Sequence, residues 1–331
     1  MTLRLLLIPL ALGLALLAPP AAASDGPVLV PVVSGKPGAP DAELVVLCPD
    51  IGERPEVFQA RDDDGLALAL ARAGYRVLLV DPWNTSEAGE RGFDAVVSDV
   101  FPDILARVES RAAGAPVTWI GHGLCGLLPV AAAASPRGTA LAYRWVALGT
   151  RFDFRHLAPR YRSWLETFAD GIQPLPEVVM DVLATGLRPG VGARVGSLPE
   201  SMPQEGDLAK TLQLAYDRNW FREPPEAVVK DLLRWSASGG LPSRQGWVDY
   251  RDGLQSIASP GFVAAGMSDP VAPPEDALVA VDAIGGRVPV IWHLLSRGSG
   301  HTEEYGHLGM LVSRHAARDV DAAILRWLKG E

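Results

Sequence analysis

Short apolar runs that alternate with amphipathic stretches are the feature of this 331-residue chain that most limits its fold. Runs such as Leu44–Cys48 and Tyr75–Val80 are apolar at nearly every position, which is typical of strands buried on both faces. Between such runs lie helical patterns, the clearest being Phe93–Val108, where apolar residues recur every three or four positions. Pro102 falls inside this pattern, so we expect a kink there. Strands that alternate with helices predict an α/β fold, a mostly parallel sheet with helices on both faces.

The remaining elements continue this alternation in two blocks. Strands are expected near residues 27–33 and at residues 116–120, 144–148, 261–265 and 288–295, and helices at residues 66–73, 124–134 and 316–328. Between residues 152 and 258 the alternation stops, and amphipathic stretches with many prolines and four tryptophans follow instead. Residues 24–151 and 259–331 are therefore predicted to form the α/β core, and residues 152–258 a helical cap inserted into it.

The N-terminal segment differs from the rest of the chain. Arg4 is followed by an apolar run of 13 residues, Leu5–Leu17, and then by small residues that end in Ala21-Ala22-Ala23 before Ser24. This is the pattern of a cleaved secretory signal peptide, and the run is short for a membrane span of about 20 residues. We therefore expect a signal peptide at residues 1–23, export to a periplasm or out of the cell, and no stable membrane span after cleavage.

Charge and composition narrow the classes of partner. The formal net charge is −9 and there is no run rich in Lys or Arg, which argues against nucleic acid as the main partner and against tight binding to anionic membranes. The histidines lack ligand spacing and no acidic cluster joins them, so no metal site is predicted, and no other cofactor is expected. The expected partner is a small molecule.

The segment "WIGHGLCG", residues 119–126, has the form of a sharp turn between a strand and a helix. Gly121 and the small residue Cys125 flank the turn at the spacing of a G-x-S-x-G nucleophile elbow, but Gly123 stands where the nucleophile belongs. Two later segments follow the order of a catalytic triad. Asp269 lies in the loop after a late predicted strand, and His307 lies in "EYGHLGML" before the last predicted helix.

In this order of elbow, acid and histidine the chain resembles the α/β-hydrolase superfamily over residues 27–327. It is nearest in look to lipase-like and polyhydroxyalkanoate-synthase-like members, whose last segment reads much like "DYGHLDLL". The resemblance implies that Asp269 is the catalytic acid and His307 the catalytic base. It also implies that the backbone N–H groups of Ile51 and Leu124 form the oxyanion hole. The Trp and Leu content of the insertion suits a cap over a cleft for an acyl or apolar ligand, but an ordinary packed subdomain would have the same composition.

Three departures from the family pattern cluster near the elbow. Gly123 has no side chain, so His307 has no hydroxyl or thiol to deprotonate. The loop after the strand that ends at Cys48 reads Pro-Asp-Ile-Gly where family members commonly carry His-Gly, and a carboxylate at Asp50 would oppose a developing oxyanion. Pro129 is expected to disturb the helix after the elbow.

The two cysteines, Cys48 and Cys125, allow three interpretations. Cys125 could replace the missing nucleophile, but two residues rotate a helix by about 200°, so its side chain should face away from the elbow position. If the family's strand order holds, the two cysteines lie near adjacent strand ends, and in an exported protein they could form a disulfide. They could also be two small buried hydrophobic residues.

These observations lead to two hypotheses of function. The first is an exported protein with the hydrolase fold that lacks ordinary serine-hydrolase chemistry and still binds an acyl or apolar ligand. The second is an active ester hydrolase or acyltransferase that uses water activated by His307 and Asp269, or the thiol of Cys125. Nothing in the sequence specifically supports a third class, a structural or partner-binding envelope protein.

Overall fold

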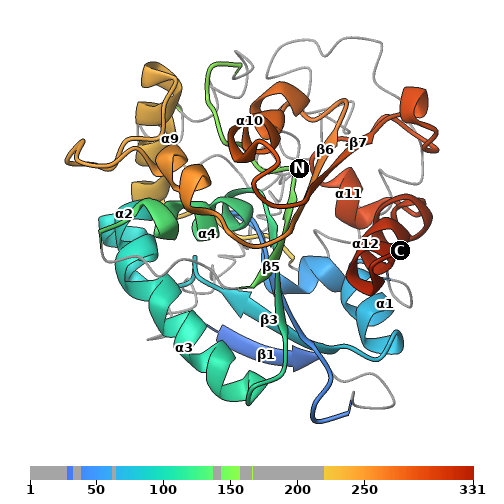
Figure 1. Cartoon of the computed structure of the whole chain (residues 1–331). Helices are drawn as coiled ribbons and strands as arrows, with labels where there is room; N and C mark the ends of the chain where they lie inside the picture. The colour runs from blue at the N-terminus through green and yellow to red at the C-terminus, as the bar shows by residue number, and fades with distance from the viewer. Residues whose placement is uncertain (1–27, 33–38, 62–64, 137–142, 157–165, 167–219) are drawn as a thin grey trace, which may run out of the picture.

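The computed structural model describes residues 28–32, 39–61, 65–136, 143–156, 166 and 220–331 (Figure 1). The predicted signal peptide, residues 1–23, lies outside the described residues, as does most of the predicted cap between residues 157 and 219. Among the described residues, no helix is long and apolar enough to cross a membrane.

A seven-stranded sheet in the order β1-β3-β2-β4-β5-β6-β7 forms the centre of the molecule. Its strands are β1 (Val28–Val32), β2 (Leu44–Cys48), β3 (Arg76–Asp81), β4 (Val117–His122), β5 (Arg144–Leu148), β6 (Gly261–Gly266) and β7 (Val290–Leu295). The edge strand β1 runs antiparallel to β3, and all other neighbouring pairs are parallel. The predicted α/β class with a mostly parallel sheet is confirmed.

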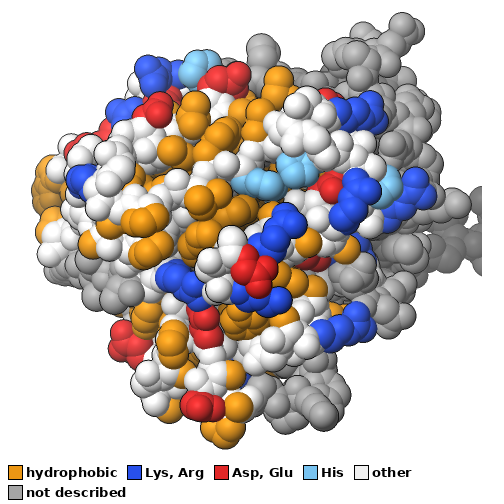
Figure 2. All heavy atoms as spheres, turned by 45° about the vertical axis from the view of Figure 1, so that its right-hand side comes forward, with side chains coloured by type: hydrophobic (Ala, Val, Ile, Leu, Met, Phe, Trp, Pro, Cys, Tyr) orange, Lys and Arg blue, Asp and Glu red, His pale blue; other side chains and the backbone are white. Residues whose placement is uncertain are grey.

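Helices cover both faces of this sheet. They are α1 (Leu66–Arg72), α2 (Phe93–Ala95), α3 (Phe101–Ala112), α4 (Leu124–Ala134), α9 (Glu226–Ser238), α10 (Pro274–Ile284), α11 (Gly309–Val312) and α12 (Ala322–Lys329). Figure 1 shows α1 and α12 together on one side of the sheet and α3 and α4 on the other. The face in Figure 2 carries acidic and basic side chains close together, with hydrophobic side chains between them.

The helix predicted for Phe93–Val108 is interrupted before Pro102. A π-helical turn, η3 (Val96–Val100), separates α2 from α3, and the N–H of Phe101 donates to the carbonyl of Val96, five residues back. Pro102 then lies in the first turn of α3. Pro102 has no N–H to donate, and the wider π-helical turn before it accommodates this. The expected kink is therefore present as this π-helical turn.

Pro129 does not disturb α4, contrary to our expectation. The helix continues from Leu124 to Ala134 with Pro129 inside it. A proline removes the bond to the carbonyl four residues back, here that of Cys125. That carbonyl instead accepts a 2.9 Å hydrogen bond from the indole Nε1 of Trp119 on β4. A tertiary contact therefore satisfies the group that the proline leaves without a partner.

Trp119→Phe should destabilise the protein by about 1–3 kcal/mol beyond the loss of packing, because it leaves the buried Cys125 carbonyl unsatisfied. Urea unfolding measures this effect. Adding Pro129→Ala should restore part of the loss, since an alanine at that position would supply the missing N–H. If Trp119→Phe lowers the free energy of unfolding equally with proline and with alanine at position 129, the indole hydrogen bond does not compensate for the proline.

The described end of the predicted cap packs on the core. The Trp235 ring of α9 is buried and meets the Phe93 ring edge-on at 5.0 Å between centroids. The 3-10 turn η4 (Tyr250–Ser256) lies against α4, where a side chain at Gly253 would overlap the carbonyl of Val130. Residues 220–256 therefore share the hydrophobic core of the α/β domain, and the boundaries predicted for the insertion stay a prediction.

Candidate active site

Four loops meet at the carboxyl edge of the sheet, because parallel strands end on the same side. Asp50 follows β2, Gly123 follows β4, Asp269 follows β6, and His307 lies in the segment after β7. The side chains of Asp50, Asp269 and His307 are all buried. The structure thus brings together Gly123, Asp269 and His307, as the resemblance implied, and adds Asp50 to them.

The predicted sharp turn between β4 and α4 has glycine at its apex. Gly123 has φ 53° and ψ −126°, in the left-handed region that favours glycine. Its N–H donates to the carbonyl of Leu148 at 2.9 Å, and its carbonyl accepts from the hydroxyl of Thr150 at 2.9 Å. These two hydrogen bonds hold the backbone in a sharp strand-to-helix turn that carries no side chain at its apex.

His307 and Asp269 form the pair predicted from the sequence. The Nδ1 atom of His307 lies 2.9 Å from Oδ2 of Asp269. The other oxygen of Asp269 accepts the backbone N–H groups of Val271 and Ala272, each at 2.8 Å. These bonds fix the carboxylate, which in turn orients the imidazole ring.

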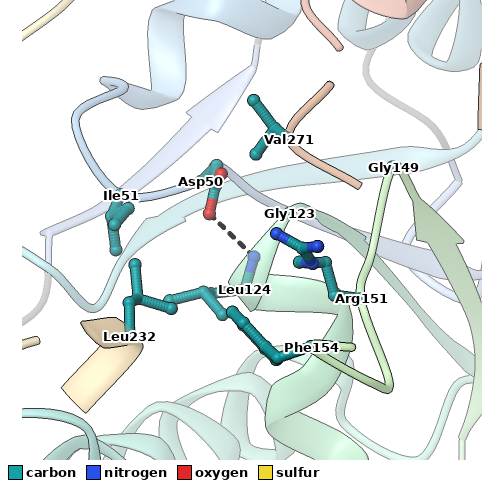
Figure 3. Close-up of a pocket in the computed structure, with 9 residues that line it drawn as sticks. All are labelled: Asp50, Ile51, Gly123, Leu124, Gly149, Arg151, Phe154, Leu232 and Val271. Carbon is teal, nitrogen blue, oxygen red and sulfur yellow. Dashed lines mark hydrogen bonds between the residues drawn. The ribbon is translucent and has the colours of Figure 1, made fainter. Parts of the chain in front are cut away.

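The carboxyl group of Asp50 occupies the space into which a side chain at position 123 would extend. A Cβ atom added to Gly123 would overlap the carboxyl group of Asp50. Oδ1 of Asp50 accepts the N–H of Leu124 at 2.7 Å (Figure 3), and Oδ2 lies 3.2 Å from Nε2 of His307. We expected Asp50 to hinder the oxyanion hole from nearby. In the structure its carboxylate takes the Leu124 N–H itself.

His307 is held between two carboxylates. Burial lowers the pKa of this ring, but the Asp269 and Asp50 carboxylates outweigh burial and raise its pKa well above 6.5. The two carboxylates therefore favour the imidazolium form of the ring, in which Nδ1 donates to Asp269 and Nε2 donates to Asp50. A protonated His307 has no lone pair with which to deprotonate water or a nucleophile.

The contribution of His307 to stability should depend on pH in one direction. Because its folded pKa is raised, the contribution is complete below pH 6.5, declines as pH rises above that value, and is lost above the folded pKa. Urea unfolding of the wild type and of His307→Gln should show a stability difference that shrinks by up to about 1.4 kcal/mol per pH unit between those limits. A difference that stays constant from pH 6 to about pH 9 would contradict a raised pKa.

Glu53 and His122 support the Asp50 loop, and neither was predicted from the sequence as a site residue. Oε2 of Glu53 accepts the N–H of Asp50 at 3.0 Å and lies 2.9 Å from Nδ1 of His122. Nε2 of His122 lies 3.2 Å from the carbonyl of His307, which can only accept, so this nitrogen carries a proton. The His122 and His307 rings are 4.3 Å apart between centroids. The sequence signal of Glu53 and His122 was weak because the two residues are 69 positions apart.

Among the described residues, Glu53, His122 and His307 are the group whose side chains could converge on a metal ion, with ligand atoms within 4.8 Å of one another. Both nitrogens of each ring already take part in hydrogen bonds. A metal ion would have to replace at least one of these bonds, so the arrangement is better described as a hydrogen-bonded network.

Of the three interpretations of the two cysteines, the structure shows the disulfide. Cys48 and Cys125 are joined in a disulfide, with their Cα atoms 5.6 Å apart. Cys48 ends β2 and lies beside Gly121 of β4, which is the adjacency that the family's strand order implied. Cys125 is buried and has no free thiol, so it is not the substitute nucleophile.

No protein-family model matches this sequence, and none of the curated proteins matches it. Solved structures do match. A bromoperoxidase from Bacillus anthracis superposes with a TM-score of 0.56 at 18% identity, covering 92% of this chain and 95% of that one. An esterase from Thermogutta terrifontis gives 0.54 at 17% identity, covering 92% and 93%. A lipase-esterase related protein from Clostridium acetobutylicum gives 0.55 at 13% identity, covering 91% and 98%.

The chain has the α/β-hydrolase fold. The similarity to these structures extends over almost the whole chain, and the strand order and the elbow agree with it. At these sequence identities the comparison establishes the fold. Any reaction must be inferred from the residues of the site.

A pocket opens beside the elbow of this α/β-hydrolase fold (Figure 3). Its empty volume is about 270 Å³, part of it open to solvent. The residues that line it are Asp50, Ile51, Gly123, Leu124, Gly149, Arg151, Phe154, Leu232 and Val271. Most of the wall is apolar, and Asp50 and Arg151 are its two charged side chains. The predicted oxyanion residues Ile51 and Leu124 both belong to it.

Arg151 is a further residue of the site that the sequence analysis missed. Its Nε and Nη2 atoms donate to Oδ2 of the buried Asp276, at 3.1 and 2.6 Å. Its guanidinium carbon also lies 4.5 Å from the centre of the Phe154 ring. The one available signal was its place three residues after β5, at the edge of the sheet where ligands bind.

Proposed function

We propose that this exported α/β-hydrolase-fold protein lacks serine-hydrolase chemistry and binds a small acyl or apolar ligand in the pocket beside Asp50. One observation carries the proposal. The Asp50 carboxylate fills the space of the nucleophile side chain and accepts the Leu124 N–H that would otherwise stabilise an oxyanion. The Cys48–Cys125 disulfide supports export, because disulfides persist in oxidising compartments.

Ester hydrolysis by activated water is disfavoured by the same contacts. Water would need a neutral His307 as its base, but both carboxylates favour the protonated ring. The tetrahedral intermediate would need the Leu124 N–H, which is 2.7 Å from Asp50 Oδ1. A negative charge at Asp50 would also repel the developing oxyanion.

Hydrolysis of short and long acyl p-nitrophenyl esters by the mature protein tests this proposal. We expect the rate of the wild type to equal that of His307→Ala. Cys125→Ala is a poor control alone because it breaks the disulfide, so Cys48→Ala/Cys125→Ala should be assayed beside it. Substantial turnover that His307→Ala abolishes and the double cysteine variant keeps would overturn the proposal in favour of activated water.

A second candidate function follows from the contacts of Asp50. A carboxylate can act as a nucleophile, and Asp50 lies between His307 and the N–H of Leu124. An oxygen of Asp50 would attack a saturated carbon, form an ester bond and expel the leaving group with its electron pair. The neutral ester would no longer hold the pKa of His307 so high. His307 could then release its proton to solvent and accept one from the water that cleaves the ester, while the Leu124 N–H stabilises the oxyanion on Asp50.

Substrates with a leaving group on a saturated carbon, such as alkyl chlorides and epoxides, separate the two candidates. If Asp50 is a nucleophile, we expect product to form with the wild type and not with Asp50→Asn. We also expect a covalent adduct on Asp50 in His307→Gln, detected by intact-protein mass spectrometry. If neither product nor adduct forms, the nucleophilic role of Asp50 is excluded and ligand binding without catalysis remains the proposed function.

A further inference from the structure

We propose that Arg151 is the specificity-determining residue of the pocket, and that its Nη1 group donates a hydrogen bond to the carbonyl oxygen of an uncharged ligand. This inference rests on the proposed function in one respect, the binding of a ligand beside Asp50. It adds the polar group that the ligand must carry and its charge.

The first step is the unused donor of Arg151. The side chain is only 4% exposed, and Nε and Nη2 are taken by Asp276. Nη1 is buried and has no hydrogen-bond partner among the described residues. Buried donors are normally paired, so an unpaired one at a pocket wall indicates a partner that binds there. Figure 3 shows the guanidinium group directed into the pocket, beside Gly123 and across from Asp50.

The second step is the charge around that donor. Asp276 neutralises Arg151 through two hydrogen bonds, and its other oxygen lies 2.6 Å from Nδ1 of the half-exposed His156. On the other wall of the pocket, Asp50 lies 3.2 Å from Nε2 of His307, whose Nδ1 lies 2.9 Å from Asp269. Even with His307 protonated, these three side chains keep one negative charge in excess. A ligand carboxylate would be repelled by Asp50, whereas a neutral carbonyl oxygen can accept from Nη1 without that penalty.

The third step is the apolar part of the wall. Ile51, Leu232 and Val271 give the pocket an aliphatic wall, and Phe154 adds an aromatic face. The ligand class is therefore a ketone, ester or amide with an apolar body.

Methyl butyl ketone is the probe for this inference, since a ketone cannot be hydrolysed and its binding reports no catalysis. Its comparison ligands are the alkene in which a CH2 group replaces the carbonyl oxygen, and hexanoate. Affinities are measured by NMR titration of the mature protein. We expect the ketone to bind at least about ten-fold more tightly than either comparison ligand, because each lacks either the acceptor or the neutral charge.

Two lysine variants test whether the preference for the ketone depends on Arg151. Arg151→Lys keeps a positive charge beside Asp276 but loses the planar fork, so it should lose the preference for the ketone over the alkene. Arg222→Lys is the matched control. Arg222 is also mostly buried and paired with a carboxylate, Asp81, but it does not line the pocket, so its variant should keep the preference.

If Arg151→Lys does not fold, the guanidinium resonances of the wild type give the same information. They should shift on addition of the ketone and stay in place on addition of the alkene. Equal affinities for ketone and alkene, tighter binding of hexanoate, or no saturable binding because ordered water alone serves Nη1 would each overturn the inference. Ester turnover in the earlier assay would instead overturn the proposed absence of serine-hydrolase chemistry and leave these affinities meaningful.

Discussion

Asp50→Gly combined with Gly123→Ser should turn this protein into an ester hydrolase, with a rate about 100-fold or more above that of the wild type. The double variant would place a hydroxyl near His307, in the space that the Asp50 carboxyl group now fills. It would free the Leu124 N–H, and a single oxyanion donor is commonly worth about 100- to 1,000-fold in rate. It would also remove one of the carboxylates that keep His307 protonated, so the ring could act as a base.

The single variants are the matched controls for this experiment. Gly123→Ser alone should give no gain, because the new side chain and Asp50 compete for the same space, and φ 53° is strained for serine. Asp50→Gly alone should also stay inactive, since no nucleophile is present. Adding His307→Ala to the double variant should abolish the new activity. A double variant that folds and stays inactive would show that the acid and histidine loops no longer support catalysis.

Loss of the Cys48–Cys125 disulfide should lower the free energy of unfolding by about 4 kcal/mol in the chain-entropy model, because the bond closes a long loop. The two residues are 77 positions apart. Urea unfolding of the wild type should therefore shift to lower urea on addition of reductant, and Cys48→Ala/Cys125→Ala should unfold at low urea with or without reductant. The disulfide also ties the end of β2, just before Asp50, to the first turn of α4.

Thiol counting under denaturing, non-reducing conditions checks the premise of this prediction. We expect no free thiol in the wild type. Two free thiols, or an unfolding curve that reductant leaves unchanged, would contradict the stabilising role of the bond.

The elements of the core were accessible from the sequence because buried strands and amphipathic helices have distinct hydrophobic periods. Leu44–Cys48 and Arg144–Leu148 were predicted at the bounds that β2 and β5 have. Pro129 was misjudged because its effect depends on a partner outside its helix. The Trp119 indole that satisfies the Cys125 carbonyl comes from the preceding strand, and local propensity does not contain that contact.

The site divides in the same way. Gly123, Asp269 and His307 could be predicted as neighbours because each follows a recognisable segment in a fixed order along the chain. The position of the Asp50 carboxyl group could not be predicted in this way. It contacts Gly123 and His307, which lie 73 and 257 positions further along the sequence. Arg151 was missed for a related reason, since its partner Asp276 lies 125 positions further along.

The sequence by itself determined the α/β class, and it predicted the turn at Gly123 and the positions of Asp269 and His307 after it. These features are carried by local patterns, which a strand or turn imposes on its own residues. Only the tertiary structure decided that the empty place at Gly123 is filled by Asp50, that Cys125 is bonded to Cys48, and that Arg151 faces the pocket with an unused donor. Those outcomes depend on distances between side chains from different strand ends, which are set when the parallel strands come together at one edge of the sheet.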